Sequence, residues 1–343
     1  MPDITALSRR SILFLPLALA ACKPGSPVVE VSGSTMGTHY AVAAIDHDRK
    51  LSRGDMSKAI ESALADVNDQ MSNWREDSEV TRFNTDRSTA ALPVSSGLAK
   101  VVEAAQDVHL ASDGQFDITL GPLIELWGFG AHGKVGQTPS DAEIADALRT
   151  TGQSRTLRVG NGMLQKMDPG TAIYLSAIGK GYGVDRIAQA LAGLGVTDYL
   201  VEIGGDLYSS GRNPDGLPWQ IGIESPDARD QSLQKIVGIS NMGMATSGDY
   251  RNYFEMDGVR YSHILDAHTG RPVTHTTASA TVLTDNAMLA DAWATAMLIL
   301  GRERGLQIAE TEGLATLFVE RDPNASNTDF VATASSQFSK LVA

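Results

Sequence analysis

Short strand-like segments follow one another closely after residue 199, and this feature restricts the possible folds most. Alternating or continuous apolar runs predict strands at residues 40–45, 157–159, 199–203, 219–223, 234–239, 279–282 and 316–319. Those beyond residue 199 are joined by short turns, as antiparallel neighbours are. A doubly wound parallel sheet would alternate strands and helices more regularly. The pattern predicts an α+β body with largely antiparallel pairing in its second half.

Helical periodicity is clearest at residues 56–71, 97–112, 141–150, 183–194 and 288–300. In the last segment, apolar residues recur every four positions from Met288 to Leu300. From Gly33 onward there is no low-complexity segment, long linker or internal repeat. We therefore expect one continuous body over residues 33–343.

The beginning of the chain has the composition of an export signal. Arg9 and Arg10 precede ten apolar residues at positions 12–21, whereas a membrane-spanning helix needs roughly 20. The segment therefore predicts a cleaved signal peptide over residues 1–21. Its arginine pair resembles a twin-arginine export signal.

The end of this segment, Leu19-Ala20-Ala21-Cys22, resembles a bacterial lipobox, in which the cysteine is acylated and becomes the mature N-terminus. A plain secretory signal with an incidental cysteine is the alternative. Cys22 is the only cysteine of the 343 residues, so the chain cannot form an internal disulfide. We expect lipidation at Cys22 and a tether over residues 22–32.

The charge balance excludes one large class of partner. The formal net charge is −13, from 28 Lys and Arg against 41 Asp and Glu. Nucleic-acid binding requires a basic footprint, so it is not expected. A local basic pocket for a phosphate remains compatible with this balance.

A glycine-rich segment at residues 179–183 precedes a helical run that we expect to begin near Tyr182 or Gly183. Val184 stands where a Rossmann fingerprint needs its third glycine, and Gly181 follows Lys180 where a Walker loop needs Ser or Thr. Glycines let a ligand approach the backbone, and a lysine suits a phosphate. The alternative is a strand-to-helix turn whose lysine is only solvated.

Two polar residues interrupt the apolar helix at 288–300. Asp291 and Thr295 are four residues apart, so their side chains lie on one helix face. A carboxylate and a hydroxyl in this arrangement suit a hard cation such as Mg²⁺. Alternatively, Asp291 bonds to a neighbouring helix and Thr295 to its own.

A histidine with nearby carboxylates is the candidate acid–base group. His263 could act as a general base on a hydroxyl. Ser247, His263 and Asp249 could also form a hydrolase triad, although no G-x-S-x-G motif surrounds Ser247. A purely structural histidine is the third possibility.

Aromatic residues next to glycines and polar groups are candidates for stacking on a heteroaromatic ring or for filling the core. They are Trp74, Phe116, Trp127 and Phe129. Asp117 could bind a sugar or ring nitrogen, or cap the following turn.

The order of the motifs is more specific than any one of them. They are GSTMGT (33–38), MS (71–72), DSE (77–79), RFN (82–84), FD (116–117), GPL (121–123), LWGFG (126–130), GKGY (179–182), VD (184–185), GGDL (204–207), ATSGDYRNY (245–253), SHILD (262–266), TGRPV (269–273) and ADAWATA (290–296). This order resembles the FAD:protein FMN transferase family, the ApbE family, across nearly the whole mature chain.

The resemblance implies a fold and an activity for residues 33–343. The family fold is an α+β, T-fold-like architecture with FAD in a cleft between two subdomains of one catalytic body. Mg²⁺-bound FAD is cleaved at its pyrophosphate, FMN passes to a Thr or Ser hydroxyl of an acceptor protein as a phosphoester, and AMP leaves. The glycine-rich segment would face the diphosphate and the metal.

The resemblance also assigns residues. His263 would be the base, and Asp291, Thr295 and the Ala177 carbonyl would bind Mg²⁺, with Asp249 and Thr246 in support. The FAD site would comprise Met36, Trp74, Gln115, Phe116, Asp117, Lys180 and Leu265. Tyr174 stands where the family commonly has aspartate, and Trp74 where it often has Tyr or Asn.

Taken with the leader, the resemblance implies an inner-membrane lipoprotein facing the periplasm. Its acceptors would be subunits of membrane redox complexes that carry a Thr or Ser flavinylation motif. Two alternatives are an Mg²⁺-dependent FAD pyrophosphatase that releases FMN and AMP, and a non-enzymatic periplasmic FAD-binding lipoprotein.

Overall fold

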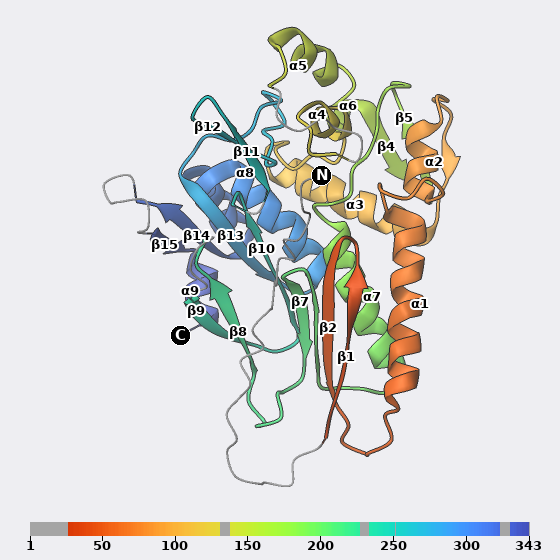
Figure 1. The fold of residues 1–343 in the computed structure, drawn as a ribbon, viewed down its shortest axis with the longest axis vertical. Coiled ribbons are helices and arrows are strands. Elements are labelled where there is room, and N and C mark those ends of the chain that lie inside the picture. Colours follow the sequence, from red (N-terminus) through yellow and green to blue (C-terminus); the bar gives the residue numbers. More distant parts are fainter. Residues whose placement is uncertain (1–26, 131–137, 227–232, 251, 323–329, 343) are drawn as a thin grey trace, which may run out of the picture.

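The computed structural model describes residues 27–130, 138–226, 233–250, 252–322 and 330–342 (Figure 1). The strands are β1 (Val28–Thr35), β2 (Thr38–Ile45), β3 (Leu92–Pro93), β4 (Leu157–Gly160), β5 (Met163–Lys166), β6 (Tyr199–Ile203), β7 (Asp206–Ser210), β8 (Trp219–Glu224), β9 (Leu233–Ile239), β10 (Met242–Gly248), β11 (Tyr253–Met256), β12 (Val259–Ser262), β13 (Thr277–Thr284), β14 (Ala315–Arg321) and β15 (Phe330–Ala334). The helices are α1 (Arg53–Met71), α2 (Glu79–Thr85), α3 (Ser96–Ala111), α4 (Gly121–Leu126), α5 (Asp141–Leu148), α6 (Gln153–Thr156), α7 (Gly179–Gly193), α8 (Ala287–Glu312) and α9 (Ser336–Leu341).

An eight-stranded sheet is the centre of the fold, in the order β1-β2-β6-β7-β10-β13-β14-β15. Every neighbouring pair in it is antiparallel. Three small sheets, β3-β5-β4, β8-β9 and β11-β12, lie outside it. The α+β prediction with antiparallel pairing in the second half is confirmed.

Alternation along β2 explains why both faces of this sheet are covered. Val42 and Ala44 pack with residues of α1 and α7, whereas Ala43 and Ile45 pack with residues of β8, β9 and α9. Successive side chains of a strand point to opposite faces, so these apolar neighbours supply two separate layers. Figure 1 shows α1 and α7 on one side of these strands and β8, β9 and α9 on the other.

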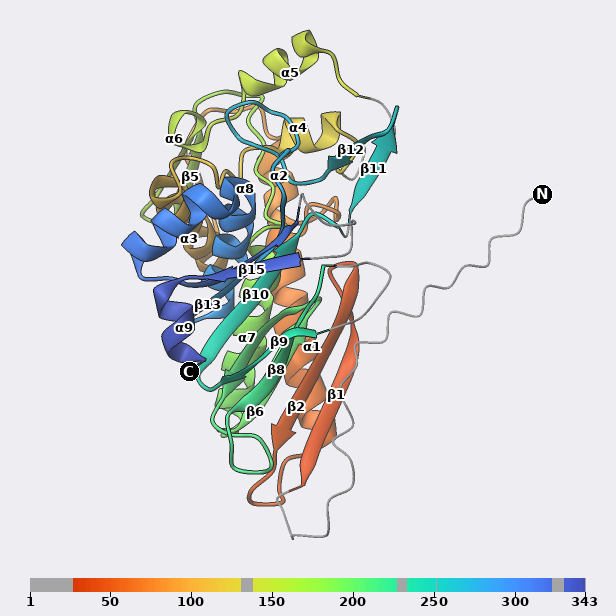
Figure 2. The same ribbon diagram turned by 90° about the vertical axis from the view of Figure 1, so that its left-hand side faces the viewer.

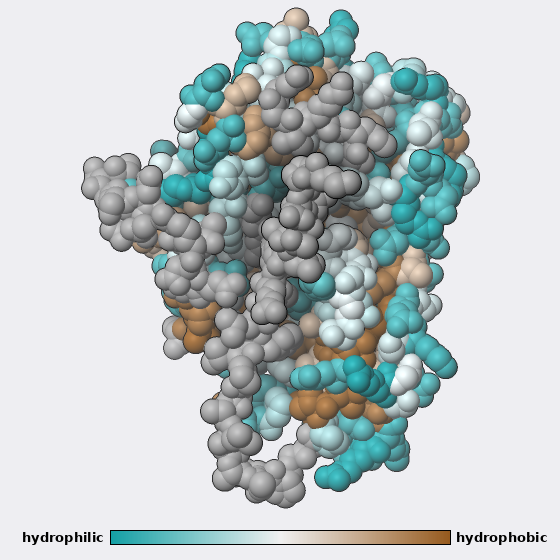
Figure 3. Space-filling model, viewed as in Figure 1, coloured by the Kyte–Doolittle hydropathy of each residue, from teal (hydrophilic) through white to brown (hydrophobic). Residues whose placement is uncertain are grey.

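The remaining small elements gather at one end of the molecule, where α4, α5, α6, β11 and β12 lie (Figures 1 and 2). A separate apolar cluster holds this end together, and Trp127 and Leu265 belong to it. Hydrophilic residues predominate on the visible surfaces of α1 and α5 (Figure 3).

Helix α8 is bent where the predicted helix at 288–300 ends. Gly301 has φ 70° and ψ 171°, a backbone conformation that favours glycine. His275 Nε2 donates to the Ile299 carbonyl at 3.2 Å, and the Arg302 N–H donates to Thr277 Oγ1 at 3.1 Å. These bonds stabilise backbone groups at the break in the helix.

The predicted boundary of the body differs from the observed one. Residues 28–32 belong to β1 and pair with β2, so the predicted tether over 22–32 is wrong for that part, and the body begins before residue 33. β-branched valines at 28, 29 and 31 favour a strand there. The signal peptide, Cys22 and the start of the tether lie outside the described residues. None of the described helices is long and apolar enough to cross a membrane.

Candidate active site

A cavity of about 410 Å³ lies where the central sheet meets the end of the molecule that carries α4. Segments far apart in the sequence line it, including the β1–β2 turn, the end of α1, the segment before α7, the end of β10 and the first turns of α8. Nearly all of the predicted site residues line this cavity: Met36, Trp74, Phe116, Asp117, Ala177, Lys180, His263, Leu265, Asp291 and Thr295. The fold therefore brings together residues that were selected separately along the sequence.

The glycine-rich segment is the first turn of α7 and not a loop before it. The helix begins at Gly179, with Ile178 as its N-cap, so the predicted start near Tyr182 is wrong. Glycine disfavours helix interiors, which is why the sequence pattern placed the boundary later. Lys180 is thereby held on a rigid helical turn beside the cavity.

The close contact between α7 and α8 explains why residue 181 is a glycine. A Cβ atom there would lie 2.2 Å from the Ala287 carbonyl oxygen and 2.8 Å from the Asp291 Cβ. The Gly181 N–H donates to Asp291 Oδ2 at 3.0 Å. The glycine lets α7 approach α8 closely and so places Lys180 beside Asp291.

A lysine between two buried carboxylates forms the polar centre of the site. Lys180 Nζ lies 2.5 Å from Asp206 Oδ2 and 3.3 Å from Asp291 Oδ1. The two aspartates are 3% and 2% exposed, so little water screens these charges. Burial alone would lower the pKa of Lys180, but the adjacent carboxylates raise it above its ordinary value, and the side chain stays charged.

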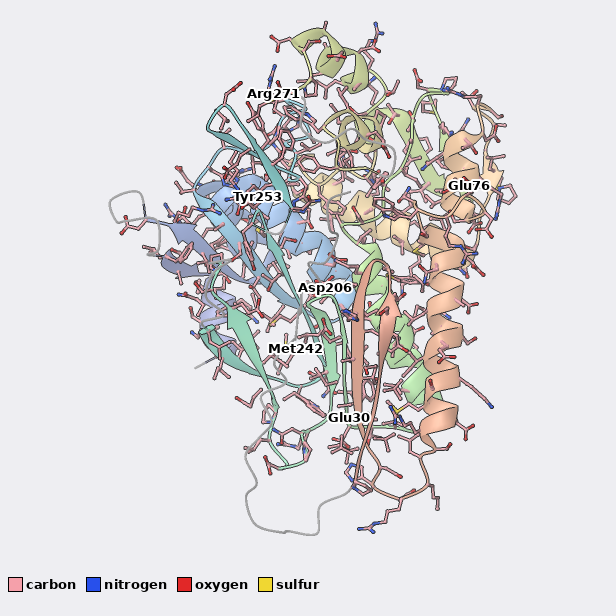
Figure 4. All side chains as sticks on the ribbon, in the orientation of Figure 1. Glu30, Glu76, Asp206, Met242, Tyr253 and Arg271 are labelled. Atoms are coloured by element: carbon pink, nitrogen blue, oxygen red, sulfur yellow. The ribbon has the colours of Figure 1, made fainter. Side chains whose placement is uncertain are left out.

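Asp206 is a residue of the site that the sequence alone does not indicate. It follows the β6–β7 turn near the middle of the molecule (Figure 4), and it lines the cavity. Its only signal in the sequence was its place in the ordered motif GGDL, because a single aspartate after a turn does not indicate a site. With Asp291 it supplies two negative charges for one lysine.

The residues proposed for Mg²⁺ present oxygen atoms of three kinds. Asp291 and Thr295 lie one turn apart on α8, and they line the cavity together with Ala177. Thr295 Oγ1 lies 3.0 Å from Ser247 Oγ. Within the described ranges no three His, Cys, Asp or Glu side chains cluster as metal ligands. A hard cation that takes one carboxylate, a hydroxyl and a carbonyl fits this set, because Mg²⁺ uses few protein ligands and keeps positions for phosphate.

His263 is held by one carbonyl. The Asn252 oxygen accepts both the His263 backbone N–H, at 3.1 Å, and the ring Nδ1–H, at 3.0 Å. Since a carbonyl only accepts, the neutral ring carries its proton on Nδ1 and leaves Nε2 as an acceptor. Burial lowers the pKa of His263, the bond to Asn252 and the charge of Asp249 oppose that shift, and Lys180 adds to it.

The hydrogen bonds do not form a hydrolase triad. Ser247 bonds to Thr295, Asp249 to Arg321, and His263 to Asn252. A triad requires the base to bond both its nucleophile and its orienting acid. Among the described residues, His263 therefore has an acceptor nitrogen and no hydrogen bond to Ser247, which bonds to Thr295 instead.

Two predicted FAD-binding residues have internal partners. Asp117 accepts hydrogen bonds from the Thr119 and Gln153 N–H groups at 2.7 and 2.8 Å, which is the turn-capping alternative. Gln115 is not among the residues lining the cavity and donates to Asp266 Oδ2 at 3.1 Å. Contact of Gln115 with FAD stays a prediction that the cavity does not support.

Comparison with known proteins agrees with these features. A family model described as "ApbE family" matches residues 36–318. The FAD:protein FMN transferase of Vibrio cholerae is 40% identical over 94% of this chain and 95% of its own length. The solved structure of flavin transferase ApbE from Vibrio cholerae superimposes with a TM-score of 0.85 at 38% identity, covering 92% of this chain and 99% of that one. The apo form of Pseudomonas stutzeri flavinyl transferase ApbE gives 0.85 at 39% identity, with 93% and 98% covered.

The fold and the site thus define a transferase that takes flavin from FAD to a protein. The family suggested by the ordered motifs is confirmed: the chain belongs to the ApbE family.

Proposed function

We propose that this enzyme transfers FMN from Mg²⁺-bound FAD to a Thr or Ser hydroxyl of its acceptor protein, as a phosphoester, with release of AMP. The observation that carries this proposal is the convergence of Lys180, Asp291, Thr295 and His263 on one cavity. Asp291, Thr295 and the Ala177 carbonyl would hold Mg²⁺, which supplies charge neutralisation at the diphosphate.

The residues of the chain account for the proton and the charge in this reaction. His263 Nε2 accepts the proton of the acceptor hydroxyl, whose oxygen bonds to the phosphorus of the FMN half. The bond from that phosphorus to the bridging oxygen breaks, and AMP leaves with the bridging oxygen. The Lys180 ammonium stabilises negative charge on the phosphates, because a diphosphate needs nearby cations in the transition state.

The leader supports a location for this reaction. We place the enzyme in the inner membrane, anchored by lipid at Cys22 and facing the periplasm, with periplasm-facing subunits of membrane redox complexes as acceptors. Confinement to the same membrane raises the effective concentration of such acceptors.

Asp291→Ala tests the proposed metal site. The full chain in detergent is incubated with FAD, Mg²⁺ and a peptide bearing the acceptor threonine, and mass spectrometry follows the peptide, FMN and AMP. We expect an FMN adduct with the unchanged protein and a loss of about 10²-fold or more in the variant, because metal stabilisation of the transition state is worth several kcal/mol.

Asp215→Ala, in the exposed turn between β7 and β8, is the matched control and should transfer normally. Full activity of Asp291→Ala would contradict the metal site. AMP and free FMN without an adduct, on several acceptor peptides, would favour the pyrophosphatase, and bound but intact FAD would favour the carrier.

A further inference from the structure

An ion pair outside the phosphate-binding part of the site joins two strand ends of the central sheet. Asp249 directly follows β10. Its two carboxylate oxygens accept hydrogen bonds from the two terminal guanidinium nitrogens of Arg321, at 2.8 and 2.6 Å. Arg321 is the last residue of β14. The Asp249 side chain is only 13% exposed, and such two-point pairing is stronger and more directional than a single contact.

The same aspartate is connected to the segment that carries the base. Arg260 of β12 donates from Nη2 to the Asp249 carbonyl at 2.9 Å, and its guanidinium lies 3.9 Å from the centre of the Tyr253 ring. Tyr253 lies above the end of β10 in Figure 4. The preceding residue, Asn252, supplies the carbonyl that holds His263. Arg260 therefore joins Asp249 to β12, the strand that ends one residue before His263.

We propose that Asp249 and Arg321 form a positioning pair for His263. This inference rests on the proposed role of His263 as the base. The pair fixes Asp249, whose carbonyl holds Arg260 of β12, and β12 leads directly into His263. It thereby helps to keep the imidazole against the Asn252 carbonyl, in the tautomer whose Nε2 can accept a proton. Neither residue touches the reacting atoms in this role.

Charge gives the pair a second effect, which a purely structural clamp would lack. When His263 accepts the proton it becomes a cation, and the negative charge of Asp249 stabilises that form. The charge of Lys180 acts on the ring in the opposite sense and disfavours the cationic form. Phe129, which lies edge-on to the ring at 6.2 Å between centroids, carries no charge. Removing the charge of Asp249 leaves the base weaker.

The test is Asp249→Asn in the full chain, which keeps the shape and removes the charge. With FAD, Mg²⁺ and the acceptor peptide, we expect kcat to fall by about 10- to 100-fold, less than the loss of about 10²–10⁴-fold attributed to removal of a general base. KM for FAD should not change. The acidic limb of the pH–rate profile should move to lower pH. With a lower pKa, His263 stays neutral, and therefore active, at pH values where the ring of the unchanged protein is protonated.

NMR titration of the His263 ring protons, assigned with His263→Gln, measures the same change independently of activity. It should give a lower pKa for His263 in Asp249→Asn. Arg321→Gln and the double variant Asp249→Asn/Arg321→Gln complete a double-mutant cycle. The losses in kcat should be non-additive, as expected for residues that act as a pair. Glu320→Gln, which breaks the neighbouring pair with Arg302, is the control and should leave rate and titration unchanged.

An unchanged titration and kcat in Asp249→Asn would overturn the inference, as would a fall in thermal stability that accounts for the whole loss of activity. Full activity of His263→Ala would instead refute the proposed base. The NMR result for Asp249→Asn would then still report whether the pair acts on the ring.

Discussion

The carbonyl oxygen of Asn252 determines which nitrogen of His263 can accept a proton. It accepts the Nδ1–H at 3.0 Å, so Nε2 is unprotonated in the neutral ring. Burial lowers the pKa of His263 from the ordinary value of 6.5. The ring is consequently neutral at physiological pH, which is the state a base requires. The sequence indicates His263 as the candidate base. It does not show that the Asn252 carbonyl, just before β11, lies next to the ring, so the tautomer could not be predicted from it.

The lowered pKa of His263 predicts the pH dependence of transfer. The unprotonated ring is active, so kcat/KM should fall as pH decreases through a value below 6.5. His263→Ala should lower the rate by about 10²–10⁴-fold and abolish this limb. His47→Ala, at an exposed surface histidine, is the control. A limb centred above 6.5, or one that persists in His263→Ala, would contradict the assignment.

At the scale of elements, the site depends on how closely α7 approaches α8. Asp185 of α7 accepts the Ala287 and Met288 N–H groups at the start of α8, at 2.8 and 3.0 Å. Burial raises the pKa of Asp185 to about 6, while those two donors favour its charged form. Gly181 removes the steric obstacle one turn earlier on α7. The two helices therefore behave as one unit that fixes Lys180 relative to Asp291.

Gly181→Ala should separate these helices. Its new Cβ would lie 2.2 Å from a backbone oxygen, which cannot rotate away, and overpacking of this kind costs about 1–3 kcal/mol or more. We expect a lower urea midpoint and weaker transfer. Gly193→Ala at the end of the same helix meets nothing within 4 Å and should be neutral or stabilising. Equal midpoints for the two variants would show that the helix contact is not tight.

At the scale of the whole molecule, the order of motifs predicted the family, while their contacts came only from the fold. Strand periodicity located β6, β8 and β13 because their apolar residues are continuous or alternate. It missed β10, in which glycine, alanine, threonine and serine interrupt the apolar pattern, and β11 and β12, which form a two-stranded sheet of their own. Trp127, a candidate for stacking, is buried and donates to the Gly270 carbonyl at 2.8 Å. One sequence indicates candidate residues such as Lys180 and Asp291, but it does not show that Asp206 and Asp291 both contact Lys180.

Anchoring of the whole molecule is predicted to depend on Cys22. Cys22→Ser should move the protein from the membrane fraction to the soluble periplasmic fraction of expressing cells, since acyl chains contribute about 0.8 kcal/mol per buried CH₂. Mass spectrometry of the mature N-terminus would show whether the acyl groups are present. Ser26→Ala is the control and should stay in the membrane. A soluble protein with unchanged Cys22 would refute the anchor.

Because of the bend at Gly301, the side chains of the two halves of α8 do not follow one continuous helical repeat. In a straight helix, inserting or deleting one residue turns everything beyond it by about 100°. Here the left-handed glycine breaks the helical repeat, and His275 and Thr277 fix the chain on either side of it. Changes in length after Gly301 therefore need not rotate Asp291 and Thr295 away from the cavity. The second half of the helix packs into the core through Ile308 and Ala309, and the half that carries the site has an orientation of its own.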